Sequence, residues 1–297
     1  MEKKNDNTLL KNASFLMVAA LVSKIIGLIY KSPLSATLGN ESFGCFSFAQ
    51  NVYLILLMIA SYSIPQAVSK IMAERIAFKR YRDAQRIFKG ALLYAVIVGG
   101  VVAIFCVVGA PILIPDSMAN ARLALQFLSP TIFLSGILGV FRGYFQAYRN
   151  MLPTSLSQIF EQIAVAVVAL VMANFMVNYF ADAETDVLRS WSAAGATMGT
   201  GAGVATALIF MLLVYWVNRK IIGKKIEKDT VSVNESYSSV MKNIILIVSP
   251  IILSSFLYNV NTYLNSRIYS QISGMQGLDS SLIESLYAEC GYFMTLI

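Results

Sequence analysis

Residues 12–36 read NASFLMVAALVSKIIGLIYKSPLSA and decide the kind of fold. Lys24 and Lys31 are the only charged side chains in this run. As a helix the run would be about 37 Å long at 1.5 Å per residue, whereas the hydrocarbon core of a bilayer is about 30 Å thick. It also extends well past the short apolar region of a secretory signal. The stretch therefore predicts a membrane-spanning helix that stays in the protein.

The whole chain has the same character. Of its 297 residues, 57% are hydrophobic and 13% are charged, and the mean hydropathy is +0.66. Soluble domains are about half apolar and about a quarter charged, so water is not the main solvent of this protein. We expect an all-α polytopic membrane protein with crossings near residues 12–36, 43–69, 88–114, 121–147, 154–179, 190–217 and 242–266, and an eighth that begins near residue 282.

These crossings fall into two groups. We expect a six-helix N-terminal transmembrane lobe over residues 1–217, a basic cytoplasmic linker over residues 218–241, and the beginning of a second, incomplete lobe over residues 242–297. The sequence ends at Phe293 to Ile297, inside an apolar run too short for a full crossing. A helix that stopped within a bilayer would leave backbone groups without partners. We therefore expect this chain to be the front part of a longer protein, truncated at its C-terminal side.

The basic residues indicate the orientation. Eighteen of the 23 lysines and arginines precede the first crossing, follow the second, end the fourth or join the sixth to the seventh. The opposite connections carry mainly Asp and Glu. The positive-inside rule therefore predicts a multi-pass protein of the cytoplasmic membrane with its N-terminus in the cytoplasm. It also explains the net charge of +7 without a nucleic-acid partner.

The sequence carries no enzyme signature. It has no histidine, which excludes Ser-His triads and the zinc-binding HExxH motif, and its three cysteines are isolated from one another. The motifs GxxxxGK[ST] and GxSxG do not occur either. We expect no catalytic residues, no metal site and no cofactor. A polytopic protein with charged residues inside its crossings is most simply a transporter.

Two lysines lie where lipid would not tolerate them. Lys24 lies about 18 Å into the first crossing, and Lys31 follows seven residues later on the same helix face. An ionisable group at such a depth is costly unless it faces protein or a wet cavity. We interpret the pair as the cationic, substrate-binding wall of an aqueous cavity. The alternative is that a lysine, most simply Lys31, extends to the lipid headgroups.

Opposite charges at matched depth connect the fourth and fifth crossings. Arg142 lies about 10 Å before the turn near residues 150–153, and Glu161 lies about 12 Å after it. Gln158 shares one face of the fifth crossing with Glu161. We predict an ion pair, with Arg142 contributing to substrate binding and with Glu161 and Gln158 acting in gating or coupling. The alternative is a purely structural pair that holds two helices together.

The later crossings carry two further patterns. The seventh has a polar stripe with helical spacing, Ser254, Tyr258, Asn261 and Asn265, and Arg267 follows at its outer end. Asn261 and Arg267 are candidate substrate-binding residues, but such a stripe can equally form hydrogen bonds to neighbouring helices. The sixth crossing has a ridge of small residues that predicts close helix packing, formed by Gly195, Gly199 and Gly203.

Five stretches carry a resemblance to a known group of transporters. They are SKIIGLIYK at residues 23–31, IPQAVSKIMAE at 64–74, FRGYFQAYRNMLPT at 141–154, SQIFEQ at 157–162 and AAGATMG at 193–199. In this order they resemble the multidrug/oligosaccharidyl-lipid/polysaccharide (MOP) exporter superfamily. The resemblance is to its stage V sporulation protein B-like polysaccharide-biosynthesis branch, to which lipid II flippases are related.

This resemblance implies a V-shaped transporter whose two six-helix lobes face each other around a central cavity. The chain would supply the N-terminal lobe, the first helix of the C-terminal lobe and the start of its second helix. The implied activity is the flipping, by alternating access, of a saccharide or peptidoglycan precursor joined through pyrophosphate to a polyprenyl lipid. Lys24 and Lys31 correspond to cationic cavity residues of the relatives. The implied partners are this lipid-linked substrate, membrane lipid, and proteins of cell-wall or polysaccharide biosynthesis.

The sequence departs from the family and leaves other functions open. An acidic residue and further arginines in the first two helices of lipid II flippases have no equivalent here, so the substrate and the coupling ion stay open. A cation-coupled drug extruder of the same superfamily would call for a carboxylate in the first helix, where the two lysines stand. A non-transporting scaffold or partner subunit fits a truncated chain. A glycosyltransferase or polymerase would need a large acidic loop, whereas the connections here are short and basic.

Overall fold

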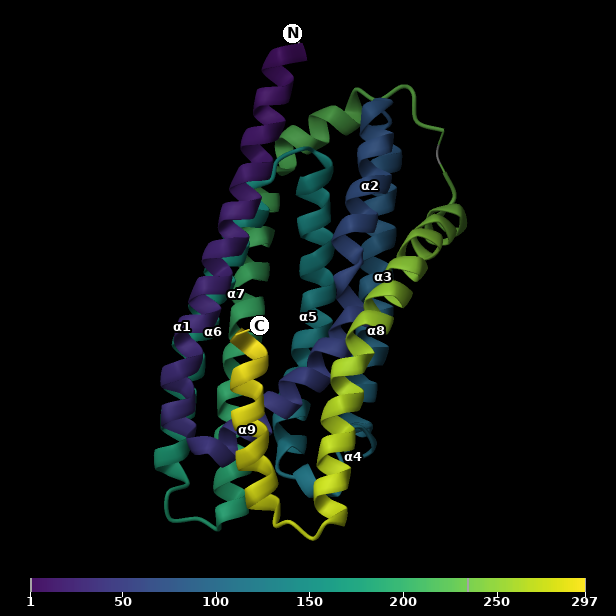
Figure 1. Ribbon diagram of the computed structural model, residues 1–297. Coiled ribbons are helices and arrows are strands. Elements are labelled where there is room, and N and C mark those ends of the chain that lie inside the picture. Colours follow the sequence, from purple (N-terminus) through teal and green to yellow (C-terminus); the bar gives the residue numbers. More distant parts are fainter. Residues whose placement is uncertain (1, 234, 297) are drawn as a thin grey trace.

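The computed structural model describes the backbone of residues 2–233 and 235–296, and the side chains of residues 14–233, 235–257 and 260–289. Throughout this part of the chain the regular elements are helices. Most of them run roughly along one common direction (Figure 1). The predicted all-α fold is confirmed.

The first two predicted crossings are joined by a kink instead of a loop. Helix α1 spans Glu2–Leu57, but Gly39 within it has φ 71° and ψ 166°, which is not a helical conformation. A positive φ of this kind costs glycine little and other residues more. Figure 1 shows that α1 descends from the N-terminus, turns at the opposite end of the bundle and rises again. A π-helical turn, Met58–Tyr62, then leads into α2, Ile64–Ala77.

The next helices overlap the predicted crossings. They are α3 (Tyr81–Val108), the short α4 (Ala110–Leu113) with a 3-10 turn at Asp116–Met118, α5 (Ala121–Ala147), α6 (Leu152–Tyr179) and α7 (Thr185–Glu227). Helix α3, however, begins seven residues before the predicted third crossing and ends at Val108, before Gly109 and the short α4. Helix α7 continues ten residues beyond the predicted end of its crossing at residue 217. At 43 residues it is about 64 Å long, longer than a bilayer core requires. The first part of the expected linker is therefore helical.

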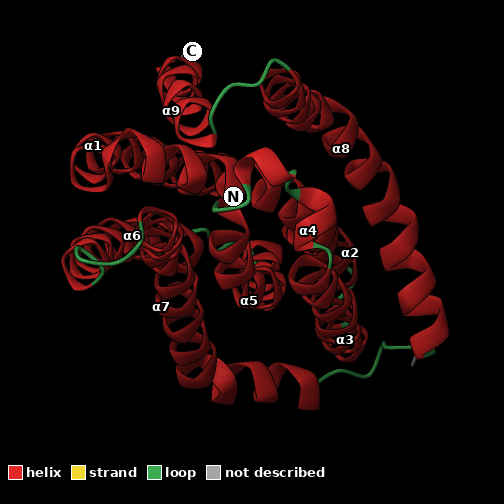
Figure 2. Ribbon diagram, turned by 90° about the horizontal axis from the view of Figure 1, so that it is seen from below, coloured by secondary structure: helices red, strands yellow, loops and turns green. Residues whose placement is uncertain are grey.

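Two helices follow the linker. Helix α8 spans Tyr237–Met275 and α9 spans Ser280–Leu296, close to the expected seventh crossing and the expected start of the eighth. Viewed along the bundle, they lie on one side of the cluster formed by α1 to α7 (Figure 2). Val240 and Ile244 of α8 belong to one apolar core, and Ile283 and Tyr287 of α9 belong to a second, against which Tyr263 and Tyr269 of α8 also pack.

Within the described part of the chain, length and composition identify six helices as candidate membrane spans. The first of these, Ser14–Ala77, has 64 residues and contains both of the first two predicted crossings, which the kink at Gly39 separates. Large apolar side chains face outward on the spans. Val101, Ile104 and Val108 of α3, for example, are 63%, 67% and 73% exposed. Continuous apolar surface of this extent is typical of contact with lipid, so this is a multi-pass membrane protein.

The ridge of small residues is present and allows α6 and α7 to approach closely. A methyl group at Gly195 would lie 2.7 Å from Met176 Cγ, one at Gly199 would lie 2.5 Å from Ala169 Cβ, and one at Gly203 would lie 2.3 Å from Val165 Cγ2. These distances are far below ordinary carbon contacts of about 3.5 to 4.0 Å. Any side chain at these positions would therefore force the two helices apart.

The connections divide between the two ends of the bundle as their charge predicts. The turns after α2 and α5 and the loop from α7 to α8 lie at the same end as the N-terminus, which we call the basic end (Figure 1). At the basic end the Lys225 ammonium lies 5.2 Å from the centre of the Tyr148 ring. The opposite end carries Glu41, which pairs with Arg189 at 2.7 Å.

Candidate functional site

A cavity of about 610 Å³ lies between the two halves of α1 and the helices α6 and α7. Lys24, Gly27 and Lys31 of the first half of α1 form one wall of it, in the order that helical spacing predicts. We call it the lysine cavity. Glu161 and Gln162 of α6 and Thr200 of α7 line it as well. A methyl group at Gly27 would lie 3.6 Å from Gln162 Oε1, an ordinary van der Waals contact, so Gln162 lies directly across from this wall.

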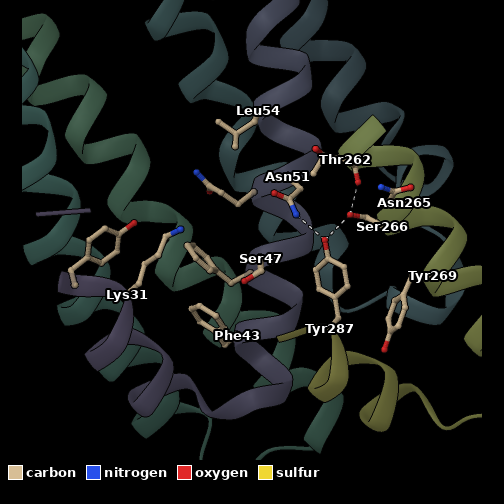
Figure 3. Close-up of a pocket in the computed structure, with 13 residues that line it drawn as sticks. Lys31, Phe43, Ser47, Asn51, Leu54, Thr262, Asn265, Ser266, Tyr269 and Tyr287 are labelled. Atoms are coloured by element: carbon tan, nitrogen blue, oxygen red, sulfur yellow. Dashed lines mark hydrogen bonds between the residues drawn. The ribbon is translucent and has the colours of Figure 1, made fainter. Parts of the chain in front are cut away.

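A second cavity of about 610 Å³ adjoins the first, between α1, α8 and α9. Its rings are Tyr30, Phe43, Phe46, Tyr269 and Tyr287, and we call it the aromatic cavity. Its neutral polar residues are Ser47, Gln50, Asn51, Thr262, Asn265 and Ser266. The two cavities share Tyr30, Lys31, Gln50 and Leu54, so Lys31 lies at their junction. In Figure 3 the Lys31 side chain extends from its helix toward the centre of this region.

The structure contains the predicted ion pair between α5 and α6. Arg142 Nη2 lies 2.6 Å from Glu161 Oε2, and the two side chains are 16% and 19% exposed. Arg142 Nε also donates a hydrogen bond to Ser157 Oγ at 3.0 Å. Glu161 lines the lysine cavity, whereas Arg142 is not among its lining residues. The guanidinium therefore lies behind the carboxylate and offsets its charge, while the ammonium groups of Lys24 and Lys31 give the cavity its positive character.

The remaining candidate residues lie in different places. Gln158 lines neither cavity, and its buried Oε1 has no hydrogen-bond partner within the described part of the chain. Asn261 is exposed and lies outside the lining of both cavities, while Asn265, one turn further along α8, lines the aromatic cavity. Arg267 Nη1 donates to Tyr263 Oη at 3.0 Å, and that hydroxyl donates to the carbonyl of Leu113 at 3.1 Å.

Arg267 thus belongs to a chain of hydrogen bonds that ties α8 to α4 and is not among the residues lining either cavity. The side chain of Tyr258, which belongs to the same polar stripe, lies outside the described residues. The stripe is therefore divided between a cavity face and a face outside it. Among the residues that the structure describes, no cluster of three or more His, Cys, Asp or Glu side chains is placed to hold a metal ion.

A hydrogen-bonded triad in the aromatic cavity was not predicted. Asn51 Nδ2 donates to Tyr287 Oη at 2.7 Å, and the Tyr287 and Ser266 hydroxyl oxygens are 2.8 Å apart (Figure 3). The triad joins α1 to α9 and α8. Beside it, Gln50 Oε1 is buried without a hydrogen-bond partner in the described chain, and Gln50 lines both cavities. The polar residues Ser47, Gln50 and Asn51 are spaced to share one helix face, and this pattern in the sequence indicates the polar side of the cavity.

Charged residues at the basic end form a second network that sequence reasoning missed. Asp83, whose side chain is fully buried, pairs with Arg80 at 2.7 Å. Its carboxylate also accepts the backbone N–H groups of Val233 and Glu235, each at 3.1 Å. The Glu235 carboxylate in turn lies 2.8 Å from both Arg75 and Arg80. The loop between α7 and α8 is therefore held against the turn between α2 and α3.

Comparison with known sequences places this arrangement in a family. Residues 9–278 match the family described as polysaccharide biosynthesis protein. Stage V sporulation protein B of Bacillus subtilis (strain 168) is 22% identical over 293 residues, which are 98% of this chain and 54% of that protein. Lipid II flippase MurJ of the same organism is 24% identical over 161 residues, 51% of this chain and 30% of that protein. This chain spans about half the length of the first of these relatives.

Solved structures show the same fold. A multidrug resistance MATE family transporter of the MOP superfamily, in an outward-facing conformation, has a TM-score of 0.64 and 14% sequence identity. A MOP superfamily transporter from Pyrococcus furiosus has a TM-score of 0.63, also at 14% identity. Each similarity covers 96% of this chain and 63% of the other. The chain therefore belongs to the polysaccharide biosynthesis protein family and has the fold of MOP superfamily transporters.

Proposed function

We propose that the protein flips a saccharide or peptidoglycan precursor, carried on a polyprenyl pyrophosphate, across the cytoplasmic membrane. The observation that carries this proposal is the wall formed by Lys24 and Lys31, two cations on one face of a cavity inside a membrane-spanning bundle. A pyrophosphate that crosses a bilayer needs cationic donors along its route, and ammonium groups provide charge-assisted hydrogen bonds. The family description and the name of the lipid II flippase relative support the same substrate class.

The charge of the lysine cavity supports an anionic substrate over a cationic one. Glu161 is the acidic residue that lines it, and Arg142 pairs with that carboxylate. A cation-coupled drug extruder would place an available carboxylate next to its substrate. Here the groups without an ion-pair partner among the described residues are the ammonium groups of Lys24 and Lys31. Two alternatives to the proposed function, a drug extruder and a non-transporting scaffold, are left to the experiment described below.

Alternating access would use the place where the lysine cavity, within α1, α6 and α7, meets the aromatic cavity. Lys31 and Gln50 lie where the lysine cavity meets a cavity built partly from α8 and α9. In an alternating-access cycle, rocking of the lobes would expose the lysine wall to one side of the membrane and then to the other. The pair of Arg142 and Glu161 would close the cytoplasmic side, or Glu161 would bind the coupling proton. Neither role makes or breaks a covalent bond within the substrate, so the proposal is a transporter and not an enzyme.

The proposed orientation has the basic end, and with it the N-terminus, in the cytoplasm, because cytoplasmic loops are enriched in Lys and Arg. Proteins of polysaccharide or cell-wall synthesis would supply the substrate on that side. The basic end needs no nucleic acid to explain its charge. The substrate and membrane lipid are the partners that this assignment requires.

Reconstituted transport tests the proposal. Proteoliposomes would receive a fluorescent polyprenyl-pyrophosphate saccharide in both leaflets, and a membrane-impermeant reductant would quench the label outside. With the wild-type protein, we expect the reductant to quench more than the half of the label that lies in the outer leaflet. With Lys24→Ala, we expect quenching to stop at that half. Quenching that stops at half with the wild-type protein would contradict the proposal. Transport of a hydrophobic cationic dye instead would favour the drug extruder.

A further inference from the structure

The aromatic cavity differs chemically from the lysine cavity beside it. Among the described residues that line it, Lys31 is the single cation, and none is a carboxylate. Apart from five aromatic rings, Leu54 and this lysine, its lining consists of hydroxyl and amide side chains. Rings and neutral hydrogen-bonding groups in one concave site form an environment for a ligand that is polar but uncharged.

The rings and polar groups are arranged as two kinds of surface. Tyr269 and Tyr287 lie with ring centres 5.9 Å apart, and Phe43 and Phe46 lie 5.8 Å apart, so pairs of tilted aromatic rings come from both α1 and the later helices. Asn51, Tyr287 and Ser266 form the hydrogen-bonded triad between these pairs. A sugar ring has the matching features, since its C–H faces pack on aromatic rings and its hydroxyls both donate and accept hydrogen bonds.

A buried acceptor also awaits a donor at the junction of the cavities. Gln50 Oε1 has no hydrogen-bond partner within the described chain, and a buried polar group without a partner is costly. A ligand hydroxyl at this position would satisfy it. Lys31 lies at the same junction, so a group bound next to Gln50 would adjoin an ammonium group. The order of chemistry along the two cavities is therefore cationic, then neutral and aromatic.

We infer that the aromatic cavity is a subsite for an uncharged saccharide, with the adjoining pyrophosphate at Lys31 and Lys24. This inference rests on the proposed function and narrows its substrate. A headgroup that carries a peptide with free carboxylates would bring charges into a cavity that has no group to pair with them beyond Lys31. Burial of an unpaired charge is unfavourable, so the geometry points to a neutral saccharide over a peptide-bearing precursor.

The test measures binding of three soluble probes to the protein in lipid nanodiscs. They are a short-chain prenyl pyrophosphate, the same compound with a neutral disaccharide, and the same compound with a sugar that carries a peptide with free carboxylates. We expect the disaccharide to tighten binding at least tenfold over the prenyl pyrophosphate, as two or more added hydrogen bonds of about fivefold each would do. The peptide-bearing probe should gain less than the disaccharide.

Variants locate the effect. Asn265→Leu and Thr262→Val should each remove about fivefold of the gain from the disaccharide, the contribution of one neutral hydrogen bond, without changing the affinity for prenyl pyrophosphate. Two variants are used so that the test still decides if one of them fails to fold. Asn178→Leu is the matched control, because Asn178 is exposed on α6 and donates to Asn174 of the same helix. It should bind all three probes as the wild type does.

The outcomes separate this inference from the proposed function. If the disaccharide adds no affinity, or the peptide-bearing probe gains as much, the saccharide subsite is wrong. Binding of prenyl pyrophosphate that depends on Lys24 would in that case leave the proposed function intact. If prenyl pyrophosphate alone fails to bind but the compound with the disaccharide binds and Asn265→Leu weakens that binding, the subsite stands and recognition of the pyrophosphate, on which the proposed function rests, fails.

Discussion

The carboxylate of Asp83, in the first turn of α3, accepts the backbone N–H of Glu235, at the end of the loop that leads to α8, with a distance of 3.1 Å. The two residues are 152 positions apart. Arg80 contacts both of their carboxylates, at 2.7 and 2.8 Å. This clamp fastens the loop between α7 and α8 to the turn between α2 and α3.

Removal of Asp83 should release the loop. Asp83→Ala leaves the Arg80 guanidinium and two backbone N–H groups without their acceptor, and loss of one partner of a buried pair commonly costs about 3 to 5 kcal/mol. We expect faster hydrogen exchange at Val233 and Glu235 and a lower unfolding temperature in detergent. Glu227→Ala, an exposed carboxylate nearby, is the control. Unchanged exchange in Asp83→Ala would show that the clamp does not hold the loop.

The same loop should loosen in acid through Asp229. Burial alone would raise the pKa of this carboxyl, but hydrogen bonds from the Ser232 hydroxyl and from the backbone N–H groups of Arg82, Val231 and Ser232 hold the pKa well below its usual value. The usual value is about 3.9. A group whose pKa is lowered on folding stabilises the fold above that value and loses this contribution as the pH falls toward the folded pKa.

We therefore expect exchange at Val231 and Ser232 to stay constant between about pH 7 and 5, after correction for intrinsic rates, and to accelerate below about pH 4. Asp229→Asn should exchange faster at neutral pH and show a weaker acid dependence. The difference between the two proteins isolates Asp229 from the other carboxylates of the loop. Parallel pH curves for both would contradict this assignment.

Much of the fold was predictable because lipid imposes a length on each apolar helix. The boundary expected between residues 36 and 43 contains Gly39, and the gap between 147 and 154 contains the start of α6 at Leu152. Continuation of α7 to Glu227 was not predicted, because Lys224 and Lys225 indicate only which side of the membrane they occupy. A polar helix beyond the bilayer has no length constraint from lipid.

The site was predictable where a charge stands inside a crossing. Lys24 and Lys31 stood out against an apolar run, and the ion pair of Arg142 with Glu161 followed from their equal distance to one turn. The triad of Asn51, Ser266 and Tyr287 could not be found in this way. Its first and last members are 236 residues apart, and neutral polar residues in membrane helices serve packing as often as binding.

Lys24 should be needed for transport and not for folding. The Lys24 side chain is exposed in its cavity, so its removal leaves no partner unpaired. Loss of a hydrogen bond to a charged group should weaken substrate binding about tenfold to hundredfold. We expect Lys24→Ala to lose transport in proteoliposomes at normal membrane abundance, and Lys24→Arg to keep part of it. Lys89→Ala, an exposed lysine outside both cavities, is the control; equal transport by Lys24→Ala and the wild type would exclude the cationic wall.

The orientation can be tested with single cysteines in a cysteine-free background. Asp182 and Asn150 are both exposed, and they lie in the connections at opposite ends of the bundle. Because basic loops face the cytoplasm, a membrane-impermeant maleimide added to intact cells should label Asp182→Cys and should not label Asn150→Cys until the membrane is opened. Labelling in the reverse order would place the N-terminus outside and invert the proposed direction of transport.

A double-mutant cycle separates two possible roles of the pair of Arg142 and Glu161, a structural contact and a proton-binding site. The two roles predict the same membrane abundance but different transport. Arg142→Gln and Glu161→Gln should each lower membrane abundance, since each leaves one half-buried charge without its partner at 2.6 Å. The neutral double variant should restore abundance in either case. If the pair only joins α5 and α6, transport returns with it; if Glu161 binds a proton that drives the cycle, transport stays lost. Strictly additive losses in both quantities would show that the two residues do not interact in the working protein, despite their contact.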